Sequence, residues 1–190
     1  MAAPVSSKPS SPKGKVPEKT KLQENKKMKK GFSTKSVVRG ALIAAAYATL
    51  SYLSAPLTFM FFQFRLSEAL CVLPIFFPEA IPGLFVGCLV ANYVSGCVIW
   101  DIIFGSVATL IGAIGARALA KLPRKLMLLS TLPTVFANAF IVPFVIIYAY
   151  GSPESYLFLF VTVLVGEVVT ATGVGTLLYY QLDKHKALIR

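Results

Sequence analysis

The residues of this sequence that could do chemistry are ionisable side chains inside long apolar stretches. A charged group in the hydrocarbon of a bilayer costs about 2.5–3.5 kcal/mol even on the most lenient insertion scale, so each such residue indicates a functional role. The candidates, with two uncharged polar companions, are Arg65, Glu68, Glu79, Asp101, Glu167, Asn92 and Asn138. Four carboxylates against one arginine favour a cationic or donor-rich ligand over an anionic one.

Several of these residues also have a purely structural interpretation. Arg65 and Glu68 are three positions apart and could pair at the start of a helix. Asp101 could simply be favoured by the positive end of a helix dipole. At the level of sequence, these interpretations stay open beside a role in ligand binding.

The two remaining carboxylates differ in their surroundings. Glu79 belongs to a break in the apolar sequence formed by Pro78, Glu79, Pro82 and Gly83. Such a break frees backbone amides that a carboxylate can accept from, so we favour a structural role for Glu79. Glu167 has no obvious local partner and is predicted to be functional, with a hydrogen bond to Asn138 across two helices as the alternative.

The elements that must position these residues are membrane helices. The sequence is 56% hydrophobic and only 14% charged, against roughly 25% charged in an ordinary soluble domain, which excludes a soluble globular protein. A bilayer core about 30 Å thick requires about 20 apolar residues per helix. Proline, glycine and charged residues interrupt the apolar sequence and predict six membrane-spanning helices, or passes, some of them short. These passes are 36–55, 66–77, 81–96, 100–122, 126–150 and 155–182.

The N-terminal segment differs from the rest of the chain. Residues 1–39 hold eleven lysines and arginines against two glutamates. Their proline, serine and lysine content cannot bury a core, so we predict a disordered segment at 1–35, a six-helix membrane domain at 36–183 and a basic tail at 184–190. Phe32 is the one aromatic residue of the N-terminal segment. Attraction to anionic lipid headgroups therefore explains the charge better than binding to nucleic acid.

Lysine and arginine also set the predicted topology. They cluster before the first pass, between the fourth and fifth passes and after the sixth. The positive-inside rule then puts both termini in the cytoplasm and predicts a multi-pass protein of the cell membrane.

Depth along the predicted helices locates a ligand-binding site near the outer face. By rise per residue, Glu68, Asn92 and Asp101 lie within about two turns of the outer surface, whereas Asn138 and Glu167 lie near mid-bilayer. Aromatic side chains beside the outer opening could stack on a ring. The predicted binding residues are Gln63, Arg65, Glu68, Asn92, Tyr93, Trp100, Asp101, Asn138 and Glu167.

A stripe of small residues on the first helix forms a second candidate site. Ala41 and Ala45, like Ala44 and Ala48, are four positions apart, a spacing that lets two membrane helices approach closely. The stripe could pack within this bundle or against a partner protein.

The sequence contains none of the catalytic motifs that we sought. His185 is the sole histidine, and Cys71, Cys88 and Cys97 are isolated within apolar sequence. Serine-hydrolase, zinc-protease and phosphate-binding loop signatures are absent. We therefore predict that the chain is not an enzyme and holds no metal or cofactor, so that transport would need an ion gradient or an ATPase partner.

Three sequence motifs carry a family resemblance. The sequences FRLSEAL at 64–70, FFPEAIPG at 76–83 and DIIFGS at 101–106 resemble the QueT family of predicted queuosine-precursor transporters, and the likeness covers about residues 36–182. It implies the substrate-binding (S) component of an energy-coupling-factor (ECF) importer, with six helices and an outer pocket. The alanine-rich first helix would dock on the transmembrane coupling subunit, and partner subunits would hydrolyse ATP.

The same resemblance implies a 7-deazaguanine ligand such as 7-aminomethyl-7-deazaguanine. Glu68 could accept paired N–H groups of its guanine-like edge, and Asp101 or Glu167 could bind the protonated aminomethyl group. The long lysine-rich N-terminus departs from a typical S component. The alternatives are a stand-alone ion-coupled transporter or small channel, and a structural membrane protein without a ligand.

Overall fold

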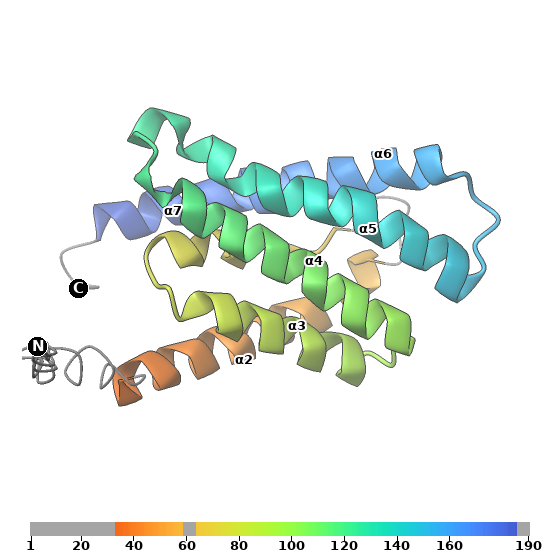
Figure 1. Ribbon diagram of the computed structural model, residues 1–190, viewed down its shortest axis with the longest axis horizontal. Helices are drawn as coiled ribbons and strands as arrows, with labels where there is room; N and C mark the ends of the chain where they lie inside the picture. Colours follow the sequence, from red (N-terminus) through yellow and green to blue (C-terminus); the bar gives the residue numbers. More distant parts are fainter. Residues whose placement is uncertain (1–32, 59–63, 186–190) are drawn as a thin grey trace, which may run out of the picture. The chain divides into compact units, whose positions relative to one another are not determined.

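The described part of the chain consists of helices joined by short turns. The computed structural model describes residues 33–58 and 64–185, and the helical unit begins at Thr34 (Figure 1). Gln63, most of the predicted N-terminal segment and most of the basic tail lie outside the described residues. The elements in chain order are α2 (Thr34–Thr58), η1 (Leu66–Ile75), α3 (Ala80–Val94), α4 (Ile99–Ala118), η2 (Leu119–Lys121), η3 (Arg124–Thr131), α5 (Leu132–Tyr150), α6 (Tyr156–Glu167), η4 (Val168–Val174) and α7 (Gly175–Lys184).

Four of the six predicted passes are long enough to cross a membrane. They are the continuous helical stretches Thr34–Ala55, Ile99–Lys121, Arg124–Tyr150 and Tyr156–Lys184. The other two predicted passes form shorter apolar helices, Leu66–Ile75 and Ala80–Val94. The prediction of an all-α membrane fold is therefore confirmed in its helical and apolar character, and six complete passes remain a prediction.

The second predicted pass is a 3₁₀-helix with Pro74 inside it. A 3₁₀-helix rises about 2.0 Å per residue, so its ten residues reach about 20 Å, compared with about 15 Å for an α-helix of the same length. This winding lets a short sequence cover much of the bundle's length. It also places Glu68 and Cys71 on one face, because residues three apart eclipse in a 3₁₀-helix.

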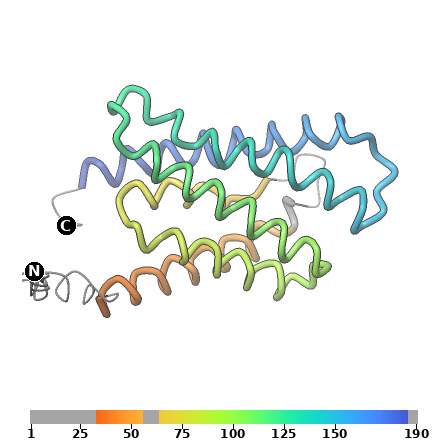
Figure 2. The backbone as a smooth tube through the Cα atoms, in the orientation of Figure 1, coloured from red at the N-terminus to blue at the C-terminus, as the bar shows by residue number. Residues whose placement is uncertain are grey.

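Helices α2 and α3 lie side by side and touch through glycines (Figure 2). A Cβ on Gly83 would stand 2.6 Å from the carbonyl oxygen of Gly40, and one on Gly87 would stand 2.8 Å from that of Ala44. Neither distance leaves room for a side chain. The glycine of the Pro78–Gly83 break is thus a packing residue.

This contact divides the alanine stripe of α2 in two. Ala44 faces α3, and Ala48 packs against a core cluster that includes Tyr47 and Leu84. Ala41 and Ala45 are exposed on the other side of the helix. One half of the stripe therefore packs within the bundle, and the other half is available to a partner.

The last two passes form an antiparallel pair with a defined turn. Gly151 ends α5 in the left-handed conformation, with φ of 67°, which glycine adopts without strain. Ser155 caps α6 by accepting a hydrogen bond from the backbone N–H of Phe158 at 3.3 Å. The sixth pass also contains a π-helical stretch, η4, that the sequence does not predict.

Candidate functional site

A pocket of about 230 Å³, lined by both polar and apolar side chains, lies where α2, α3 and α5 end and α4 begins. Its volume is below the roughly 300–1,000 Å³ of sites for drug-sized ligands, so it suits a single small ring system. Helix α2 contributes Tyr47, Ser51 and Ser54 to its wall. The other polar and charged lining residues are Arg65, Asn92, Ser95, Cys97, Asp101 and Tyr150.

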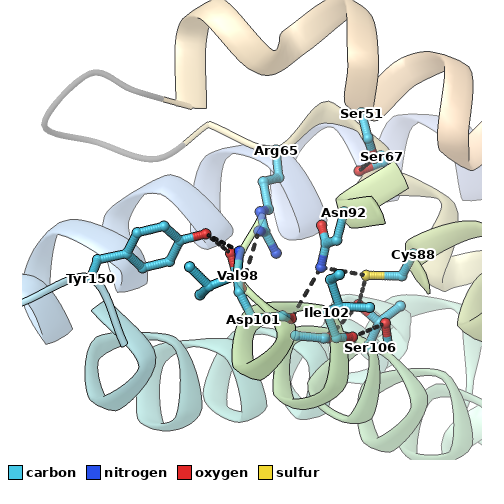
Figure 3. A network of polar contacts seen from close by, with 12 residues as sticks. Ser51, Arg65, Ser67, Cys88, Asn92, Val98, Asp101, Ile102, Ser106 and Tyr150 are labelled. Atoms are coloured by element: carbon cyan, nitrogen blue, oxygen red, sulfur yellow. Dashed lines mark hydrogen bonds and ion pairs between the residues drawn. The ribbon is translucent and has the colours of Figure 1, made fainter. Parts of the chain in front are cut away.

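Asp101 is the centre of the contacts in this pocket (Figure 3). Its Oδ2 accepts a hydrogen bond from the Tyr150 hydroxyl at 2.9 Å, and its Oδ1 lies 4.0 Å from Nη2 of Arg65. Its backbone carbonyl accepts from Nδ2 of Asn92 at 3.2 Å. Asp101 is also in the first turn of α4, so the helix dipole favours its charge as well. The helix-dipole interpretation therefore fits the position of Asp101, and its role in ligand binding stays a prediction.

Glu68 lies in the core beside the pocket and is fully buried. Its carboxylate accepts hydrogen bonds from the hydroxyls of Tyr47 and of Thr109, the latter at 3.1 Å, and from Sγ of Cys71 at 3.1 Å. Tyr47 also lines the pocket, so it joins the carboxylate to the site. The recorded ion-pair partner of Arg65 is Asp101, and no ion pair joins it to Glu68 among the described residues.

Asn138 and Glu167 lie in the core and do not line the pocket. Nδ2 of Asn138 donates to the Thr134 carbonyl at 3.2 Å. Its Oδ1, like Oε2 of Glu167, has no hydrogen-bond partner among the described residues. The alternative hydrogen bond between these two side chains is therefore not formed in the described part of the chain.

Tyr93 and Trp100 point away from the pocket. They are 75% and 56% exposed, and neither is among the residues that line the pocket. Trp100 stacks on Phe104 and lines an aromatic groove on the outside of α4 and α5. Glu79 also lies outside the pocket. Its Oε1 forms an ion pair with Nη1 of Arg39 at 3.5 Å. The predicted binding roles of Tyr93 and Trp100 stay predictions.

The sequence analysis missed the contribution of α2 to the site. Tyr47, Ser51 and Ser54 are four and three positions apart, so they share one face of the helix. A polar stripe on an otherwise apolar helix was the signal that could have found them. Tyr150, which is not among the predicted binding residues, donates a hydrogen bond to Asp101.

Cys97 offers a direct probe of the pocket. It is the partly exposed one of the three cysteines, because Cys71 and Cys88 are buried. Burial and the nearby Asp101 carboxylate raise the pKa of the Cys97 thiol. The thiolate is the reactive form, so we expect the rate of maleimide labelling to keep rising as the pH passes about 8.5, the ordinary value for cysteine.

Mass spectrometry of the labelled protein checks this expectation. The Cys97→Ser variant is the control and should show no labelling on the same timescale. Labelling that levels off below about pH 8.5, or that proceeds equally at the buried cysteines, would contradict the described pocket.

Comparison with known proteins identifies the family. A family model described as QueT transporter matches residues 37–184. No curated protein matches the chain, and no solved structure matches it. The matched residues include all of the described pocket and nearly all of the helical unit. The chain therefore belongs to the QueT transporter family and is a membrane transport protein.

Proposed function

We propose that this chain is the substrate-binding component of an ECF importer and binds a 7-deazaguanine such as 7-aminomethyl-7-deazaguanine. The observation that carries the proposal is a small pocket with a buried carboxylate, Asp101, in a chain of the QueT transporter family. Asp101 accepts hydrogen bonds and carries negative charge, which suits a flat, donor-rich and cationic ligand.

The pocket offers a partner for each part of such a ligand. Asp101 is the one carboxylate among the described lining residues, so we assign the protonated aminomethyl group to it. The Asn92 amide can both donate to and accept from a guanine-like edge, and Arg65 can donate to its carbonyl. The rings of Tyr47 and Tyr150 supply flat surfaces. We assign Glu68 an indirect role, in which it holds the Tyr47 hydroxyl.

Equilibrium binding to the detergent-purified protein tests this assignment. We expect 7-aminomethyl-7-deazaguanine to bind tightly by calorimetry, to bind better than guanine, which lacks the ammonium group, and to slow the labelling of Cys97. A folded sample that binds neither compound would overturn the ligand assignment and leave the family membership intact.

The exposed half of the α2 stripe is the surface that we assign to the coupling subunit. We expect Ala45→Leu to abolish uptake in cells that express the ECF subunits and to leave ligand binding unchanged, because the added side chain separates two closely packed helices. Ala45→Ser stays small and should retain uptake. Ala44→Leu should instead lower the amount of folded protein, because Ala44 faces α3.

A stand-alone ion-coupled transporter is the second candidate. The unpartnered oxygens of Asn138 and Glu167 favour it, because buried polar groups inside a membrane often bind protons or cations. Uptake in cells that lack every ECF subunit, driven by an ion gradient, would support this candidate over our proposal.

A further inference from the structure

A basic cleft of about 870 Å³ lies at the opposite end of the bundle from the pocket. The first turns of α2 and the last turn of α7 both lie at this end (Figure 1). Asp101 of the pocket and Arg117 of the cleft lie on the same helix, and their sixteen-residue separation corresponds to about 24 Å. This distance approaches the thickness of the hydrocarbon core, so the two sites lie near opposite membrane surfaces.

The walls of the cleft carry an excess of positive charge. The charged lining residues are Arg39, Arg117, Lys121, Arg124 and Asp183, four cations against one anion. Arg124 pairs with Asp183 at 3.4 Å, and Arg39 pairs with Glu79 at 3.5 Å. Arg117 and Lys121 have no carboxylate partner among the described residues. Two cations of the cleft are thus available to an anion.

Arg117 is held in place by the end of η1. Its Nη1 donates to the carbonyl oxygens of Pro74 at 3.2 Å and Ile75 at 3.0 Å. Its Nε and Nη2 donate no hydrogen bond to another described residue. A guanidinium anchored on one side presents its remaining N–H groups as a rigid fork, the geometry that recognises phosphate oxygens.

Apolar surface lies beside these charges. Phe76 and Tyr179 line the cleft with their rings 5.3 Å apart. Met127 of η3 also lines it, while Leu126 and Leu129, which share another face of the same 3₁₀-helix, are exposed. A phosphate site flanked by exposed leucines at the membrane boundary matches a molecule with an anionic head and an apolar tail.

We propose that this cleft binds the headgroup of an anionic phospholipid, with Arg117 and Lys121 contacting its phosphate. Charge argues against the chain's own N-terminal segment as the occupant, because residues 1–35 carry ten lysines and two glutamates. An acidic protein segment would match the charge but makes no use of the exposed leucines. The proposal requires only a membrane location and is independent of the ligand in the outer pocket.

Lipid retention by the full chain tests the proposal. Delipidated protein in a neutral detergent is incubated with phosphatidylglycerol or phosphatidylcholine, and bound lipid is counted by native mass spectrometry. We expect preferential retention of phosphatidylglycerol, weakened about fivefold by Lys121→Gln, in line with the effect of one basic residue near an anionic lipid. Arg117→Gln should weaken it at least as much.

Lys125→Gln is the matched control, because Lys125 is exposed four positions from Lys121 and does not line the cleft. The N-terminal lysines contribute equally to all variants, so the difference between the two lysine variants isolates the cleft. The proposal would be overturned if Lys121→Gln and Lys125→Gln lost phosphatidylglycerol retention equally, or if the protein retained both lipids equally well. Displacement of the lipid by millimolar inorganic phosphate or by an acidic peptide would overturn it as well, by identifying a soluble anion or a protein as the occupant.

Discussion

Replacing Asp101 by asparagine is expected to weaken binding of 7-aminomethyl-7-deazaguanine by about 10- to 150-fold, the equivalent of about 1.5–3 kcal/mol for a hydrogen bond to a charged group. The variant removes the negative charge that we assign to the ligand's ammonium group. It also leaves Arg65, which lies 4.0 Å from Asp101, as an uncompensated cation in the pocket. Calorimetry with the purified protein measures the loss.

The control for this prediction is Asp183→Asn. Asp183 also belongs to an ion pair, with Arg124 at 3.4 Å, but it lies at the far end of the bundle. Its removal should leave the affinity unchanged. If the Asp101→Asn variant bound the ligand as tightly as the unaltered protein, Asp101 would not be a ligand-binding residue.

Replacing Glu68 by alanine is expected to lower the free energy of unfolding by about 3–5 kcal/mol. The carboxylate accepts from Tyr47, Thr109 and Cys71, and the variant would remove this shared acceptor from the core. Thr109 keeps the Gly105 carbonyl at 3.2 Å as a second acceptor, so the main loss falls on Tyr47 and Cys71. Thermal unfolding in detergent, followed by the loss of soluble monodisperse protein, measures the change.

Glu79→Ala provides the matched comparison, because it removes the same side chain from a partly exposed ion pair with Arg39. The Glu79 side chain makes this one contact among the described residues and is 10% exposed, whereas Glu68 is fully buried with three donors, so the variant should lose less stability than Glu68→Ala. Glu68→Gln, which keeps an acceptor for Tyr47, should retain most of the stability and lose less affinity than Asp101→Asn. If Glu68→Gln lost more affinity than Asp101→Asn, Glu68 would be in direct contact with the ligand.

Hydropathy and chain breaks were sufficient to predict the helical segments. Runs of apolar residues separated by proline, glycine and charge determine where a chain can cross hydrocarbon, and the described helices follow those runs. They do not determine how each helix is wound. Whether a segment forms a 3₁₀-, α- or π-helix depends on what packs against it, so the 3₁₀ winding of η1 and the π-helical stretch of η4 were not predicted.

Three of the predicted binding residues line one pocket, others lie outside it, and their role in binding stays a prediction. The three lining residues are Arg65, Asn92 and Asp101. Their neighbours Tyr93 and Trp100 lie at the same depth but face outward. Successive residues on an α-helix point about 100° apart, so depth alone cannot decide which of two neighbours faces the ligand. On α2, the polar stripe of Tyr47, Ser51 and Ser54 indicates which face of that helix lines the pocket.

The 3₁₀ winding of η1 has a consequence for the whole bundle. Arg65, at one end of this helix, lines the pocket, and Phe76, just past its other end, lines the basic cleft. Rewinding its ten residues as an α-helix would shorten the segment by about 5 Å without breaking it. The distance that this segment spans between the two ends of the molecule thus depends on its winding, and the carbonyls held by Arg117 lie at the end next to the basic cleft.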